Sequence, residues 1–162
     1  MEILTKTEVA VAKGEMYRAH LRTPELADEA KCEMFIRTPA ETTSVHCHLI
    51  AQFSGELAAK ASLRESCTVS ASGAALSRFN VNRNHADSAT IVVRSSPTLT
   101  ASGTRLDILD FGGGKKGETG GDAASQVGWI AKYGTVYILR ITSKAAANEG
   151  SIRLTWREHE EA

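Results

Sequence analysis

Most of the chain alternates apolar and polar residues with a period of two, the pattern of a β-strand with one buried face. In residues 151–157, Ile152, Leu154 and Trp156 fall on one face and polar residues on the other. Residues 135–142 follow the same pattern and are rich in β-branched and aromatic side chains. Further strands are predicted at 15–22, 31–37, 44–53, 56–65, 89–95, 105–111 and 126–132. The pattern therefore predicts an all-β fold, a β-sandwich or jelly roll of about eight to nine antiparallel strands.

The termini and one short polar segment depart from this pattern. Residues 24–31 have a helical composition with Thr23 as a cap, but a polar connection between two strands accounts for them equally well. Residues 1–13 offer little that would pack, so we expect an N-terminal arm that becomes ordered against a neighbouring subunit. A chain of 162 residues suits one domain, which we place at residues 14–158. Residues 159–162 are expected to form a C-terminal tail, and the acidic stretch from Glu158 onward to be solvated.

One segment occurs twice, thirty residues apart in the sequence. Residues 68–76 and 98–106 share an initial threonine, a central Ala-Ser-Gly and a final leucine. Glycine between small polar neighbours, where two strands meet, is typical of a turn with positive φ. The two copies therefore predict two equivalent corners of the sandwich.

Charge and cysteine content narrow the function classes. Nineteen basic and nineteen acidic side chains cancel, so composition provides no field that would attract nucleic acid or anionic lipid. The N-terminus lacks the apolar run of a signal peptide and no segment reaches membrane-spanning length, so we expect a soluble product made in the cytoplasm. Cys32, Cys47 and Cys67 are expected to be reduced and partly buried. Intersubunit disulfides that form after cell lysis are the alternative.

The glycine-rich stretch 111–122 invites comparison with a phosphate-binding loop. A Walker-type loop needs Gly-Lys followed by Ser or Thr and then a helix, whereas Glu118 follows Gly117 and the next segment predicts a strand. A dinucleotide fingerprint fails on the same point, because it too requires a helix after the glycines. We therefore expect a mobile loop at a sheet edge, with Lys115 and Lys116 available to contact a partner.

His46-Cys47-His48 is the candidate metal motif. On a strand the two histidines share a face, and the motif resembles that of the cupin family, but Ala40 and Gln52 stand near the places where cupins have a glycine and a carboxylate. A cupin-like metalloprotein stays an alternative, and metal analysis of the purified protein would test it.

No other arrangement of residues indicates an enzyme. No serine lies in a Gly-x-Ser-x-Gly motif, and no cysteine, histidine and carboxylate have a recognisable spacing. The asparagine-rich stretch 79–88 is expected to form a rigid loop whose side chains satisfy the backbone, and a calcium site is the less favoured reading. We expect a protein without catalytic residues, cofactor or metal.

Several short motifs follow one another along the chain: 63–65, 68–76, Asn80-Val-Asn-Arg-Asn84, 96–106, the glycine-rich loop, 134–143 and Ile152-Arg-Leu-Thr-Trp156. Their order resembles that in a family of small β-rich virion structural proteins of tailed bacteriophages. The likeness covers residues 55–157, whereas residues 1–54 match only in strand pattern.

This resemblance implies a homo-oligomeric capsid decoration or cement protein on the virion surface, with the major capsid protein as its partner. Contacts are expected at exposed strand edges, at Lys115 and Lys116, and along the N-terminal segment that includes Glu2, Ile3, Leu4 and Val9. A tail or fibre module that recognises a host surface glycan is the alternative. The low aromatic content of 6% counts against it, because sugar sites usually present aromatic faces.

Overall fold

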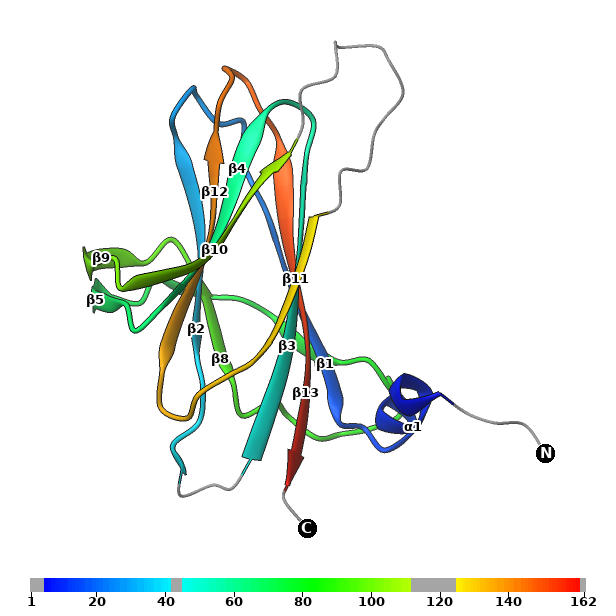
Figure 1. The fold of residues 1–162 in the computed structure, drawn as a ribbon. Coiled ribbons are helices and arrows are strands. Elements are labelled where there is room, and N and C mark those ends of the chain that lie inside the picture. Colours follow the sequence, from blue (N-terminus) through cyan, green and yellow to red (C-terminus); the bar gives the residue numbers. More distant parts are fainter. Residues whose placement is uncertain (1–4, 42–44, 112–124, 161–162) are drawn as a thin grey trace.

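The computed structural model describes residues 5–41, 45–111 and 125–160 and shows an all-β sandwich with one short helix (Figure 1). Two antiparallel sheets pack face to face. The five-stranded sheet has the order β11 (Ser125–Ile130), β3 (Val45–Gly55), β13 (Gly150–Glu160), β1 (Met16–Arg22) and β7 (Arg78–Asn80). The six-stranded sheet has the order β10 (Thr104–Phe111), β4 (Ala59–Glu65), β12 (Val136–Ser143), β2 (Lys31–Arg37), β8 (Val92–Ser95) and β6 (Ala74–Ala75).

The alternating strands bury the faces that the sequence predicts. Ile152, Leu154 and Trp156 on β13 are fully buried and meet Tyr137 and Leu139 of β12 in one core between the sheets. Tyr17 of β1 stacks on Trp156 with ring centroids 5.9 Å apart. Burial of apolar and aromatic side chains between two pleated layers is the main force that holds such a sandwich together.

The strand count is higher than predicted because several strands are very short. Thirteen strands lie within the described residues, and β5, β6, β7 and β9 have no counterpart among the predicted segments. Each of these is at most four residues long. Segments of that length do not show enough alternation to be recognised in a sequence.

The repeated segments form two equivalent corners, as predicted. β5 (Thr68–Ala71) and β9 (Thr98–Ala101) pair with each other in a two-stranded ribbon, which stands out from the body of the sandwich in Figure 1. Gly73 and Gly103 follow these strands with φ of +86° and +57°. After each glycine the chain pairs with the strand that precedes the other copy, β6 with β8 and β10 with β4. We call this reciprocal pairing, in which each copy continues into a strand beside the one that precedes the other copy, the exchange of strands between the repeats.

A second, smaller core lies under the ribbon. Val69 and Leu99 pack against Phe35 and Ile138, which are fully buried. Phe35 and Ile138 project from the face of the six-stranded sheet that points away from the main core. The apolar contacts of Val69 and Leu99, together with the exchange of strands, therefore hold the ribbon against the sandwich.

The predictions for both ends of the chain need correction. Residues 24–31 are not helical and form the polar connection, between β1 and β2, that the sequence allowed as the other alternative. The helix α1 (Lys6–Ala12) lies instead within the predicted arm and buries Ala10 against its own chain, so this part of the arm does not need a neighbouring subunit to become ordered. At the other end β13 continues through His159 and Glu160, where a tail was predicted. Cross-strand pairing with β3 extends this strand beyond the last clear apolar residue of the pattern.

Candidate interaction surfaces

Of the predicted partner contacts, only Val9 can be placed. It lies on α1 and is half-buried. The remaining predicted contacts lie outside the described residues: Glu2, Ile3, Leu4, Lys115 and Lys116.

Helix α1 begins with a capping box. The Thr5 hydroxyl accepts a hydrogen bond from the Glu8 backbone N–H, and the Glu8 carboxylate accepts from the Thr5 backbone N–H at 2.6 Å. These bonds satisfy N–H groups that a helix start otherwise leaves unpaired. Donation from the Thr5 backbone N–H, and then from the Thr5 hydroxyl, to the Glu8 carboxylate lowers the pKa of that carboxyl. The spacing Thr-x-x-Glu before an apolar run was the sequence signal that could have identified this helix.

The asparagine-rich loop clamps the end of α1. The Asn80 side chain donates to the Gly14 carbonyl at 2.6 Å, and the Asn82 side chain donates to the Ala12 carbonyl at 3.2 Å. The carbonyl oxygen of the Asn80 side chain accepts from the Asn82 backbone, and that of Asn82 accepts from the Asn84 backbone. These bonds confirm that asparagine side chains satisfy backbone groups in this stretch, although residues 79 and 80 belong to β7 and not to the loop.

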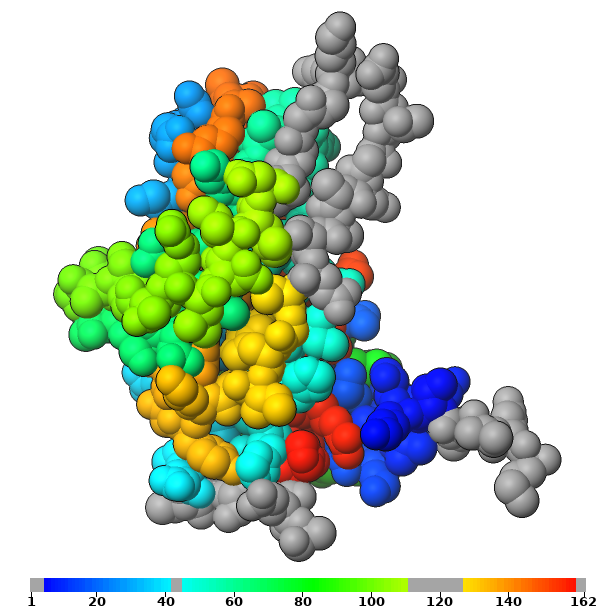
Figure 2. All heavy atoms as spheres, in the orientation of Figure 1, coloured from blue at the N-terminus to red at the C-terminus, as the bar shows by residue number. Residues whose placement is uncertain are grey.

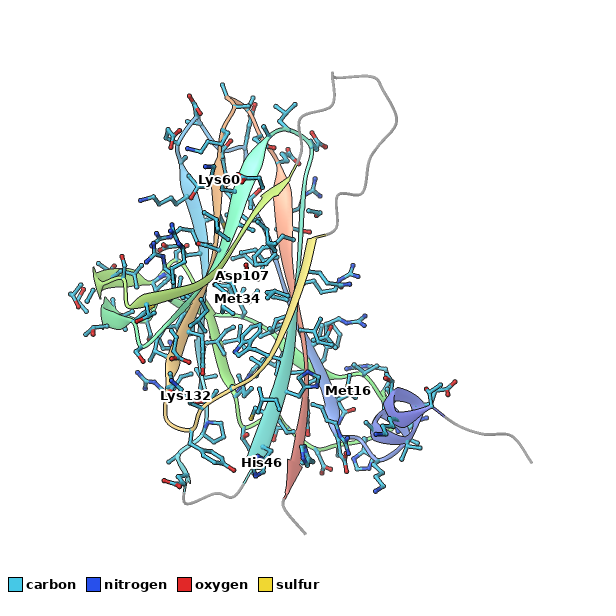
Figure 3. All side chains as sticks on the ribbon, in the orientation of Figure 1. Met16, Met34, His46, Lys60, Asp107 and Lys132 are labelled. Carbon is cyan, nitrogen blue, oxygen red and sulfur yellow. The ribbon has the colours of Figure 1, made fainter. Side chains whose placement is uncertain are left out.

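The metal motif lies on β3 with the predicted alternation, at the end of the sandwich where His46 is labelled in Figure 3. Cys47 points into the core, and its burial raises the pKa of its thiol to about 12, with a further contribution from the nearby Glu158 carboxylate. His46 shares a 2.9 Å hydrogen bond with the Tyr133 hydroxyl. His159, predicted in a tail, lies beside His46 with ring centroids 5.6 Å apart. No group of three or more potential metal ligands is present among the described residues.

Glu158 is buried, which corrects the prediction of a solvated acidic end. Its carboxylate accepts hydrogen bonds from the Thr90 backbone N–H and hydroxyl, the Ile91 backbone N–H at 3.0 Å and the Trp156 indole N–H at 2.7 Å. These donors tie the loop before β8 to β13. Both oxygens of this carboxylate accept hydrogen bonds from within the molecule. The carboxylate therefore has a structural role and is poorly placed to transfer protons to a substrate.

A second polar cluster joins the turn after β11 to the six-stranded sheet. The Tyr137 hydroxyl donates to Glu65 at 3.0 Å and accepts from the Lys132 backbone N–H, while the Lys132 ammonium lies 2.6 Å from the same carboxylate. Burial raises the pKa of Tyr137 to about 12, and the Lys132 hydrogen bond leads the effects that lower the pKa of Glu65. This cluster is also internally satisfied.

The exposed large apolar side chains of the described residues all lie on strands at the edges of the two main sheets. Phe79 on β7 is 39% exposed, Leu106 and Ile108 on β10 are 46% and 42% exposed, and Ile130 on β11 is 75% exposed. β10 and β11 run side by side on the face seen in Figure 2. Edge strands also present unpaired backbone N–H and C=O groups. Apolar side chains beside such groups favour contact with another protein chain.

The outer face of the five-stranded sheet has a different character, and we call its outward positions on β1, β13 and β3 the basic face. Strand pairing aligns Arg18 with Thr155 and His20 with Arg153 across this face. Glu15 and Glu149, which lie outside these positions, form ion pairs with Arg157 and Arg22 at 2.6 and 2.7 Å. The basic face carries four arginines and four histidines: Arg18, Arg22, Arg153, Arg157, His20, His46, His48 and His159.

No protein-family model, no curated protein and no solved structure matches this chain. Among the residues that the structure describes, no helix has the length and hydrophobicity that crossing a bilayer requires. The described residues form a β-sandwich in which the two polar clusters are hydrogen-bonded within the molecule and the edge strands carry exposed apolar side chains.

Proposed function

We propose that this chain is a capsid decoration protein of a tailed bacteriophage, which binds as a homo-oligomer to the major capsid protein on the virion surface. The order of motifs over residues 55–157 supports this function. The internal use of Glu158 and of the Glu65–Tyr137–Lys132 cluster supports a structural role over a catalytic one.

The observation that carries the proposal is the position of the exposed apolar side chains. Leu106, Ile108 and Ile130 leave apolar area in water on strands that are sheet edges within the described part of the chain, an arrangement that monomeric proteins usually avoid. Covering these edges with another chain removes that area from water and pairs the free backbone groups. The same edge strands make the contacts between copies of this protein and the contacts with the capsid shell.

Stabilisation of the shell follows from mass action. A protein that binds the assembled lattice and not the dispersed subunits adds its binding free energy to the assembled state. Many copies on one shell multiply a modest contact.

The test is the location and amount of the protein in purified particles. We expect quantitative mass spectrometry to find it at a copy number comparable with that of the major capsid protein, and antibody-labelled electron microscopy to find label over the head. Label confined to the tail would favour the glycan-binding alternative. Absence from the particle would refute a virion role altogether.

A further inference from the structure

The composition of the basic face is unusual for a solvated sheet. Its outward positions include four arginines and four histidines but no lysine and no carboxylate, among the described residues of β1, β13 and β3. Solvent-facing strands of soluble proteins ordinarily mix both signs of charge. Arginine is enriched and lysine depleted in protein interfaces, because the guanidinium is weakly hydrated and binds carboxylates through two parallel hydrogen bonds.

The arginines at the rim and at the centre of this face differ in their partners. Arg22 and Arg157 are held by Glu149 and Glu15. Arg18 is half-buried and donates to the Thr155 hydroxyl at 3.4 Å, while Arg153 is exposed and has no partner among the described residues. Neither Arg18 nor Arg153 has a carboxylate partner in the described part of the chain. The centre of the face therefore presents guanidinium groups whose charge is not neutralised.

We infer that the basic face docks on a carboxylate-rich protein surface, which under the proposed function belongs to the assembled capsid shell. The inference rests on the proposed function for the identity of the partner and on the charge of the face for its chemistry. Arg18 and Arg153 bind carboxylates of the partner, and Thr155 and the histidines supply polar contacts around them.

A nucleic acid fits this face less well than an acidic protein does. Binding that is dominated by phosphates typically uses about 6–10 cationic contacts, whereas two arginines here are free of carboxylates. Beside these three strands, Phe79 of β7 lies opposite Arg18 and is exposed, but its ring already carries the Arg83 guanidinium at 5.9 Å, so this face offers no series of free aromatic rings for successive bases among the described residues. A protein interface needs only a few well-placed arginines.

The experiment measures co-sedimentation of purified protein with capsid shells produced without it, comparing wild type, Arg153→Glu and Lys31→Glu. Lys31 is exposed on β2 of the other sheet, so its variant makes the same change in net charge away from the basic face. We expect Arg153→Glu to weaken binding by at least about tenfold and Lys31→Glu by less than about twofold. Thermal unfolding of each variant shows that the fold is retained, and Arg18→Glu provides an independent second position.

The outcomes separate this inference from the proposed function. If wild type and Arg153→Glu bind the shell equally, the basic face is not the docking surface, while the decoration role stands. If wild type does not bind the shell, both are refuted. Fluorescence anisotropy with a short duplex DNA is the third arm. Binding to that DNA that Arg153→Glu abolishes would assign the face to phosphates and overturn the inference.

Discussion

The exchange of strands between the two repeats makes Gly103 the most informative position for mutation. Gly103 lies at the corner between β9 and β10 with φ of +57°, and Gly134 has the same φ of +57° in the turn before β12. A Cβ atom built on Gly103 would overlap the Glu65 carbonyl oxygen and lie 2.9 Å from the Cys67 backbone nitrogen. A Cβ atom on Gly134 meets nothing within 4 Å. The two alanine variants therefore share the backbone strain and differ only in the clash.

The expected magnitudes follow from these two contributions. An alanine in the left-handed region costs about 1–2 kcal/mol, which applies to both variants. Gly103→Ala must also move two crossing backbone segments apart, and overpacking of this kind costs a further 1–3 kcal/mol or so. We expect a difference of about 2 kcal/mol between the variants, which corresponds to roughly 4–8 °C in melting temperature for a domain of this size.

The measurement is thermal and urea unfolding of wild type, Gly103→Ala and Gly134→Ala, followed by circular dichroism. Gly73→Ala is the symmetric check, because a Cβ atom there would overlap the Ser95 carbonyl oxygen at the equivalent corner. Equal losses of stability in Gly103→Ala and Gly134→Ala would show that the corner is not tightly packed, and would refute the close crossing on which the reasoning depends.

Three further predictions concern polar and titratable groups. Glu158→Ala leaves the indole N–H of Trp156 and two backbone N–H groups without their acceptor. We therefore expect urea unfolding to show a loss of about 3 kcal/mol or more in the free energy of unfolding. The control variant Glu25→Ala, at an exposed position, should lose less than about 0.5 kcal/mol. Burial raises the pKa of the Cys47 thiol in the folded state from its ordinary value of 9.0 to about 12. Because the unfolded state then loses the thiol proton at lower pH than the folded state, the stability of the fold falls as pH rises from about 9 to 12. Cys47→Ala should show a shallower decline of the urea midpoint over that range, and an unchanged slope would contradict the burial of the thiol. Asn80→Ala removes the clamp on the Gly14 carbonyl, so hydrogen exchange should become faster in α1 and stay unchanged in β12.

The strands were predictable wherever burial imposes a regular alternation. β13 has one face in the core, so its apolar residues Ile152, Leu154 and Trp156 recur at every second position and were assigned to the correct face. The positive φ at Gly73 and Gly103 was likewise predictable, because small polar neighbours around glycine are a local signal of a turn. α1 was missed although Thr5 and Glu8 carry its local signal, since its apolar run is too short to show a helical period.

Other features depend on neighbours that are distant in the sequence. Glu158 looks like part of a solvated acidic end until the loop before β8 supplies its hydrogen-bond donors, 67 or 68 positions away in the chain. His159 stands beside His46 only because β13 pairs with β3. The net charge of zero does not reveal the basic face, because the arginines of this face come from strands at opposite ends of the chain.

The amino-acid order alone thus determined the all-β class, the buried faces of the long strands and the two glycine corners. Each of these follows from interactions between a residue and its near neighbours in the chain, or between a face and water. The tertiary structure alone decided the exchange of strands between the repeats, the burial of Glu158 and the grouping of arginines on one face. These depend on which strands pair, and pairing is decided by the free energy of the whole assembled core.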